Sequence, residues 1–134
     1  MNNEYKALIQ YRMEQANESL DPAEILLKND KYRPSVNRSY YAMFYAILAL
    51  IIPTEHTTSK HSGAISIFNK EYVKTGIFDK DFSRWLREAF DMRQRVDYQE
   101  LFIISQERAN DIFNNAKKFV DVISREIEMK YFSS

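Results

Sequence analysis

The residues best suited to chemistry lie between positions 91 and 98, where the sequence reads Asp-Met-Arg-Gln-Arg-Val-Asp-Tyr. Arg93 carries a planar guanidinium group that stays charged at physiological pH and can donate to two oxygens of one phosphate. Asp97 follows one helical turn later, and Tyr98 comes directly after it. Ordinary Asp and Tyr side chains titrate near about 4 and about 10, so neither type readily exchanges a proton at neutral pH. The stretch therefore favours the binding of an anion over proton transfer.

Arg93 also stands where a charged residue is unusual. The residues before it repeat at the spacing of one apolar helical face, and Arg93 continues that face. The members of the face are Phe82, Trp85, Leu86, Ala89 and Phe90. Burying an unpaired charge costs several kcal/mol, so Arg93 needs a partner. Two interpretations remain: Arg93 forms a structural ion pair with Asp97 at i,i+4, or the apolar face opens into a polar cleft at Arg93.

The bulk composition limits what such a cleft could bind. The 134 residues suit one domain over 1–134, and Lys+Arg and Asp+Glu both number 19, so any polyanion site must be local. The chain has no cysteine, which excludes disulfides and thiolate metal sites and is typical of a reducing compartment. The first residues lack the apolar core of a signal peptide, and the uncharged run 39–54 is short for a bilayer span. We therefore expect a soluble, cytoplasmic protein.

Helical periodicity runs through most of the chain, and 2 Gly and 3 Pro leave little material for tight hairpins. We predict an all-α, bundle-like domain. Its first segment, about 4–29, is either one long helix kinked at Pro22 or two nearly coaxial helices, the second capped by Asp21. The other predicted helices span about 34–52, about 60–74 ending at Gly76, about 80–97 with Asp79 as N-cap, and a last one that starts at Ser105. The helix at 34–52 is apolar almost all round, so we expect it at the centre.

Four strings in this sequence resemble those of one known family. They are Tyr-Arg-Pro-Ser-Val-Asn-Arg-Ser-Tyr-Tyr-Ala-Met-Phe-Tyr-Ala at 32–46, Lys-His-Ser-Gly at 60–63, Phe-Asn-Lys-Glu-Tyr-Val-Lys-Thr-Gly at 68–76 and Arg-Gln-Arg-Val-Asp-Tyr at 93–98. In this order and spacing they resemble the small stand-alone prokaryotic proteins of the HEPN superfamily, over about residues 5–128. The resemblance implies a four- to five-helix up-down bundle, usually a homodimer, often encoded beside a minimal nucleotidyltransferase as a toxin–antitoxin pair.

The resemblance also implies a chemistry for the stretch at Arg93. Active HEPN proteins are metal-independent ribonucleases whose motif is an Arg followed, after roughly four to six residues, by a His. In such a reaction the 2′-hydroxyl of RNA attacks the neighbouring phosphate, which requires a proton acceptor and a fixed cation for the phosphoryl oxygens. In this chain Asp97 and Tyr98 stand where that His is expected. Arg93, Asp97 and Tyr98 are therefore the candidate catalytic residues, in a cleft that two subunits would share, and no cofactor is implied.

Further candidates follow from the same resemblance. It places the helix at 34–52 opposite the helix at 80–97, so Asn37 and Tyr41 would line the nucleotide- or RNA-binding cleft with Arg93; alternatively, they are a polar flank with local hydrogen bonds. Related toxins are silenced by adenylylation of the motif tyrosine, for which Tyr98 is the candidate acceptor. His56 and His61 lack a clear third ligand, so we expect no metal site. His61 is more typical of a packing or capping residue, although it could replace the missing base.

Three functions remain open at this point. The chain is the HEPN component of a toxin–antitoxin pair with a ribonuclease-like cleft, a non-catalytic module that binds RNA or a nucleotide, or a structural partner that holds a nucleotidyltransferase.

Overall fold

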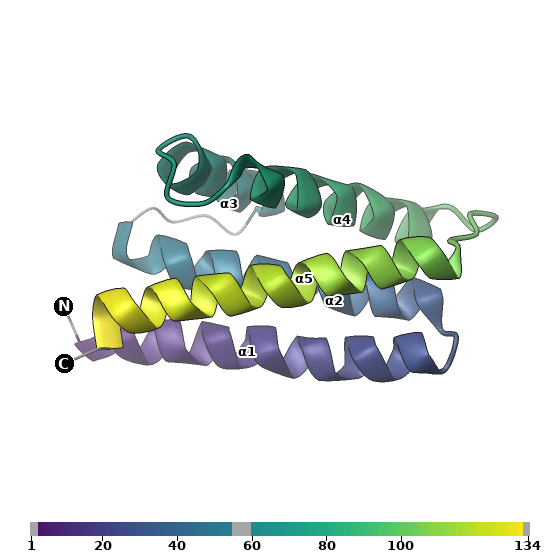
Figure 1. Cartoon of the computed structure of the whole chain (residues 1–134), viewed down its shortest axis with the longest axis horizontal. Coiled ribbons are helices and arrows are strands. Elements are labelled where there is room, and N and C mark those ends of the chain that lie inside the picture. Colours follow the sequence, from purple (N-terminus) through teal and green to yellow (C-terminus); the bar gives the residue numbers. More distant parts are fainter. Residues whose placement is uncertain (1–2, 55–59, 133–134) are drawn as a thin grey trace.

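The computed structural model describes residues 3–54 and 60–132, which form five α-helices and no strand. The α-helices are α1 (Asn3–Lys28), α2 (Tyr32–Ile51), α3 (His61–Phe68), α4 (Lys80–Tyr98) and α5 (Gln106–Ile127). A 3₁₀ turn, η1 (Ile52–Thr54), and two π-helical segments, η2 (Asn69–Val73) and η3 (Glu128–Phe132), extend three of them. The four long helices lie side by side and alternate in direction, while short α3 packs near the start of α4 (Figure 1). The prediction of an all-α, up-down bundle is confirmed.

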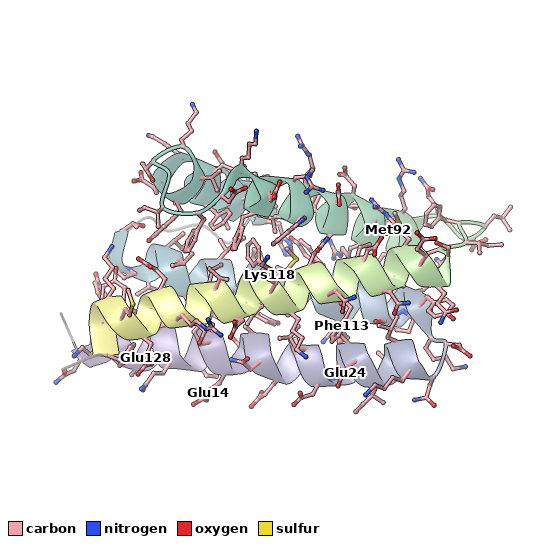
Figure 2. The ribbon with its side chains drawn as sticks, in the orientation of Figure 1. Glu14, Glu24, Met92, Phe113, Lys118 and Glu128 are labelled. Atoms are coloured by element: carbon pink, nitrogen blue, oxygen red, sulfur yellow. The ribbon has the colours of Figure 1, made fainter. Side chains whose placement is uncertain are left out.

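Helix α2 is the central element, as its apolar sequence predicted. It packs against α1, α3, α4 and α5, and most of its residues are buried. The segment Tyr32–Thr54 is long and apolar enough to cross a membrane, but 67% of its most apolar stretch is buried inside the bundle. That burial identifies it as a core helix. Charged side chains such as Glu14 and Glu128 instead lie on the outer faces (Figure 2).

Most predicted helix ends are confirmed. The Asp79 carboxylate accepts a hydrogen bond from the Asp81 N–H at 2.8 Å, and the Ser105 hydroxyl accepts from the Arg108 N–H at 3.1 Å, so both act as N-caps. Gly76 has a φ of 82°, the left-handed conformation in which glycine commonly follows a helix.

The structure decides one alternative and corrects one helix. Helix α1 runs without interruption through Pro22, so the alternative of one long helix holds and Asp21 does not start a second helix. The predicted helix at 60–74 is α-helical only to Phe68 and then widens into the π-helical turn η2.

Arg33 fixes the end of α4 that carries Arg93. Its guanidinium donates hydrogen bonds to the carbonyl oxygens of Val96 and Phe102, and to that of Gln99 at 3.3 Å. Carbonyls at a helix C-terminus lack intrahelical partners and carry partial negative charge, so a cation there is stabilising. Through Arg33, the start of α2 and the end of α4 are held in a fixed relation.

A layer of aromatic rings holds α3 against α4 and α5. Phe68 of α3 is fully buried, and its ring centroid lies 5.4 Å from that of Phe119 on α5. Phe82 of α4 lies 5.1 Å from the same Phe119 ring. These contacts set the spacing between α3 and α4, which flank the candidate site.

Candidate functional site

Arg93 lies on the inner face of α4, opposite α2, and its side chain is only 14% exposed. Its Nη2 donates to the Tyr41 hydroxyl at 2.9 Å, and its Nε lies 3.0 Å from Asp97 Oδ2. The guanidinium carbon is 5.6 Å from the Tyr40 ring centroid and 5.3 Å from that of Tyr41, a cation–π arrangement. The i,i+4 ion pair of the first sequence interpretation is therefore present, whereas the opening of the apolar face into a polar cleft stays a prediction.

Asn37 also belongs to this cluster. Its Nδ2 donates to Asp97 Oδ2 at 3.2 Å, so one carboxylate oxygen has both Asn37 and Arg93 as neighbours. The side-chain oxygen of Asn37, Oδ1, in turn accepts hydrogen bonds from Nε and Nη2 of Arg38, at 3.1 and 2.8 Å. The structure thus brings together four of the residues that the sequence pointed to: Asn37, Tyr41, Arg93 and Asp97.

Arg38 is a member that the sequence reading missed. Its guanidinium carbon lies 5.3 Å from the Tyr41 ring centroid, the same distance as that of Arg93. The spacing was an available signal, since residues three apart on a helix share a face and Arg38 precedes Tyr41 by three. With Arg38 and Arg93 against the single carboxylate of Asp97, the cluster carries an excess of positive charge, which suits an anionic ligand.

Tyr98 lies apart from the cluster. It is the last residue of α4 and is 73% exposed, whereas the side-chain partners of Arg93 within the described residues are Tyr40, Tyr41 and Asp97. Its hydroxyl is therefore accessible to another protein, although it is not placed to act with Arg93 within this subunit.

His61 lies beside the cluster, although it is more than thirty positions from Arg93 in the sequence. Its Nδ1 is 2.6 Å from the Tyr40 hydroxyl, and its ring stacks on Phe44 with centroids 4.1 Å apart. The Tyr41 ring meets it edge-on at 5.7 Å. Tyr40 and Tyr41 therefore contact both His61 and Arg93, so the one histidine that could replace the missing base is a neighbour of the arginine.

The hydrogen bond to Tyr40 decides what His61 can do. Burial raises the pKa of the Tyr40 hydroxyl, so this hydroxyl keeps its proton and donates it to a hydrogen bond. Burial and the charge of Arg93 lower the pKa of His61, so its ring is neutral at pH 7. Because Nδ1 accepts the Tyr40 proton, we infer that the single ring proton resides on Nε2. His61 then offers a hydrogen-bond donor at Nε2, where a general base would need a lone pair.

We expect an NMR titration of His61, in a His56→Gln background that leaves one histidine signal, to give a pKa below the ordinary 6.5. Arg93→Gln should raise that pKa because it removes a nearby positive charge. As the pH falls below 6.5, the unfolded chain takes up the proton before the folded chain does, so the free energy of unfolding should decrease. A pKa at or above 6.5 would contradict this environment for His61.

The described residues contain no group of three or more His, Cys, Asp or Glu side chains that could hold a metal ion. His56, which the sequence reading considered together with His61, lies outside the described residues.

Comparison with known proteins agrees with this architecture. A model of the HEPN domain matches residues 9–127. A UPF0332 protein of Thermotoga maritima is 40% identical over 126 residues, which cover 94% of this chain and 96% of that protein. Two proteins of Methanocaldococcus jannaschii carry the name "Putative toxin". One is 33% identical and covers 90% of this chain and 82% of its own length. The other is 31% identical, and the matched residues cover 96% of this chain and 95% of that protein.

Proposed function

This chain belongs to the HEPN domain family, and on that premise we propose that it is the HEPN component of a toxin–antitoxin pair, with a cleft at Arg93 that binds the phosphate groups of RNA or of a nucleotide. The relatives named as toxins support the first half of the proposal. The cluster at Arg93 supports the second half.

The observation that carries the proposal is the pair of arginines on the Tyr41 ring. Arg38 and Arg93 lie at equal distances from it, and within the described part of the chain Asp97 is the one carboxylate that pairs with Arg93. Guanidinium groups bind phosphate oxygens with short, charge-assisted hydrogen bonds. Partial burial strengthens such bonds, because water screens them less.

If the cleft cleaves RNA, the reaction needs no metal. The 2′-hydroxyl oxygen attacks the adjacent phosphorus and loses its proton, the bond to the 5′-oxygen breaks, and that oxygen gains a proton. The products are a 2′,3′-cyclic phosphate and a free 5′-hydroxyl. Arg93 would stabilise the charge that grows on the phosphoryl oxygens, and Asp97, the carboxylate paired with it, would accept the proton.

A second candidate is a non-catalytic module that binds RNA or a nucleotide, or that serves as a structural partner. Two observations favour it. Asp97 and Tyr98 stand where the family's histidine is expected, and the inferred tautomer of His61, whose Nδ1 accepts from the Tyr40 hydroxyl, leaves only a donor at Nε2. Retained arginines with no base in place would preserve binding and remove cleavage.

The partners we propose are a second copy of this chain and a nucleotidyltransferase, in the cytoplasm. The end of α4 supports this, because Tyr98, Leu101 and Ile103 are 73%, 94% and 88% exposed around the α4–α5 connection. Exposed apolar residues of this kind are typical of interaction sites.

A nucleotidyltransferase bound at this end of α4 could transfer AMP from ATP to the Tyr98 hydroxyl. The hydroxyl oxygen bonds to the α-phosphate, pyrophosphate leaves and the phenolic proton is lost.

Co-expression with the neighbouring nucleotidyltransferase gene tests this assignment. We expect the two proteins to co-purify and peptide mapping to show AMP on Tyr98, while Tyr98→Phe removes the modification. Tyr11, an exposed tyrosine that is 53% accessible on α1, serves as the internal control and should stay unmodified. A stable complex with unmodified Tyr98 would refute the role of Tyr98 as acceptor.

A further inference from the structure

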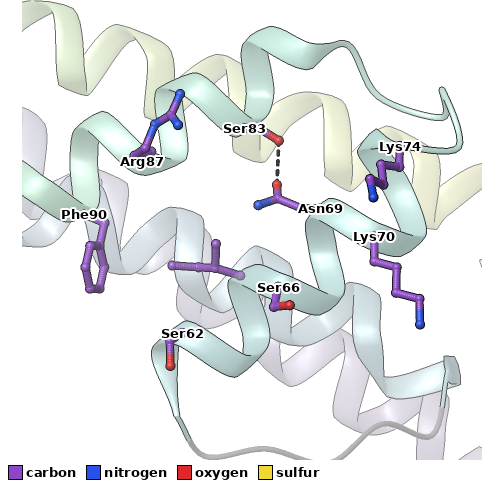
Figure 3. Close-up of a pocket in the computed structure, with 9 residues that line it drawn as sticks. Ser62, Ser66, Asn69, Lys70, Lys74, Ser83, Arg87 and Phe90 are labelled. Atoms are coloured by element: carbon purple, nitrogen blue, oxygen red, sulfur yellow. Dashed lines mark hydrogen bonds between the residues drawn. The ribbon is translucent and has the colours of Figure 1, made fainter.

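A cavity of about 620 Å³ lies between the α3–η2 segment and α4 (Figure 3). Its volume falls in the range of about 300–1,000 Å³ that is usual for small-molecule sites. Arg87, Ser83 and Phe90 of α4 face Ser66 and Asn69 across it. None of these residues has a place in the function proposed above.

The charged side chains around this cavity are all positive. Lys70, Lys74 and Arg87 line it, and no carboxylate does. Within residues 3–54 and 60–132, none of the three forms an ion pair. Four smaller hollows on the described surface each include at least one carboxylate, such as Asp121 or Glu14. A concave surface with unpaired positive charges concentrates anions, so this cavity is suited to a phosphate-bearing ligand.

The neutral lining residues add hydrogen-bond donors. The Ser83 hydroxyl donates to the side-chain oxygen of Asn69, Oδ1, at 2.5 Å. This hydrogen bond fixes the orientation of the Asn69 amide and leaves its NH₂ group to donate to a ligand. The hydroxyls of Ser62 and Ser66 provide further donors on the α3 side. In Figure 3, Phe90 stands at one end of the cavity and the two lysines at the other. An aromatic ring opposite cations matches a nucleotide, which has a base at one end and a phosphate at the other.

The cavity adjoins the cluster at Arg93. The Phe90 ring lies 5.7 Å from that of Tyr40, which also contacts Arg93, and lining residue Ser62 directly follows His61. Arg87 precedes Arg93 by six residues, a rise of about 9 Å along α4. Successive phosphates of a stacked strand are about 3.4 Å apart along its axis, so roughly two or three nucleotides would connect the two sites.

We propose that this cavity is a second nucleotide subsite for the RNA strand whose phosphate binds at Arg93. Lys70 and Lys74 bind the phosphate of a flanking nucleotide, its base packs against Phe90, and Arg87 adds positive charge on the Phe90 side of the cavity. The inference rests on the function proposed above and assigns three more cations to RNA binding. A strand that occupies both sites crosses from α2 and α4 to the groove between α3 and α4.

Fluorescence anisotropy with a labelled single-stranded oligouridylate, in EDTA, tests the subsite. We expect Lys70→Ala/Lys74→Ala to weaken binding about tenfold or more and to reduce the slope of log K against log salt by roughly 1.4, because two lysine–phosphate contacts are lost. Arg87→Glu should have an effect of the same order. The matched control is Lys28→Ala/Lys117→Ala, which removes the same charge from exposed lysines on α1 and α5 and should change binding less than twofold.

The outcomes separate this subsite from the function on which it rests. If Arg93→Ala weakens RNA binding while the Lys70/Lys74 variant binds like its control, the subsite is refuted and the Arg93 cleft stands. If the lysine variant loses affinity while Arg93→Ala does not, the cavity is supported and the Arg93 cleft is refuted. Titration with free ATP shows whether the cavity binds the phosphate of an RNA strand or that of a free nucleotide. Binding of ATP that requires Lys70 and Lys74, without binding of the oligouridylate, would refute the assignment to RNA.

Discussion

Replacing Arg93 with alanine is expected to weaken the binding of single-stranded RNA by about 10- to 100-fold. The change removes charge-assisted hydrogen bonds to phosphate, each worth about 1.5–3 kcal/mol, and 1.4 kcal/mol corresponds to a factor of ten. The salt dependence should also decrease, by roughly 0.7 in the slope, since one phosphate contact is lost. Anisotropy at several salt concentrations measures both quantities.

Two variants make the result specific to the Arg93 guanidinium. Arg95→Ala removes the same charge from an exposed position on the same helix and should change affinity only a few-fold. Arg93→Lys keeps the charge but loses the planar fork, so its affinity should lie between those of the wild type and the alanine variant. Equal losses in Arg93→Ala and Arg95→Ala would show that RNA responds to the overall charge, which contradicts a site at Arg93.

Phe68→Ala should lower the free energy of unfolding by about 3–5 kcal/mol, the upper range for a single substitution in a protein core. Phe68 is fully buried, and its ring contacts Tyr72, Phe78 and Phe119, so its removal leaves a cavity between α3 and α5. The total free energy of unfolding of a native domain is about 5–15 kcal/mol, so this loss is a large fraction of the stability. Urea denaturation followed by circular dichroism measures it.

The leucine variant is the control for Phe68. Phe68→Leu keeps most of the buried apolar volume and should cost clearly less than the alanine variant. Since Phe68 holds α3 in place, we also expect Phe68→Ala to weaken RNA binding through the subsite between α3 and α4. A loss below about 1 kcal/mol would mean that the aromatic layer does not anchor α3.

Local sequence signals predicted most of the fold. Asp79, Ser105 and Gly76 mark helix ends because capping needs a side-chain acceptor or a left-handed backbone at one known position. Pro22 left two alternatives open, because a proline removes one hydrogen bond but does not determine whether the surrounding packing keeps the helix continuous. The π-helical turn η2 has no comparable local signature, and the sequence reading missed it.

The candidate site was only partly predictable, because some of its contacts join different helices and leave no local signal in the sequence. The pair of Arg93 and Asp97 follows from helical spacing within α4, and the family resemblance placed Asn37 and Tyr41 opposite it. The contact between His61 and Tyr40 joins two helices across the bundle, so no periodicity reveals it. The same holds for the cavity between α3 and α4, whose cations come from two segments, Lys70 and Lys74 at η2 and Arg87 on α4. Contacts within one helix could be predicted, whereas those between helices required the structure.

The measurement that tests the central claim most directly is an NMR titration of the Arg93 Nε–Hε signal, assigned with Arg93→Lys, upon addition of a short single-stranded RNA in EDTA. If Arg93 binds phosphate, this signal should shift in proportion to the bound fraction measured by anisotropy, and it should shift equally in the Arg95→Ala background. An Arg93 signal that does not move while the RNA is fully bound would contradict a phosphate site at Arg93.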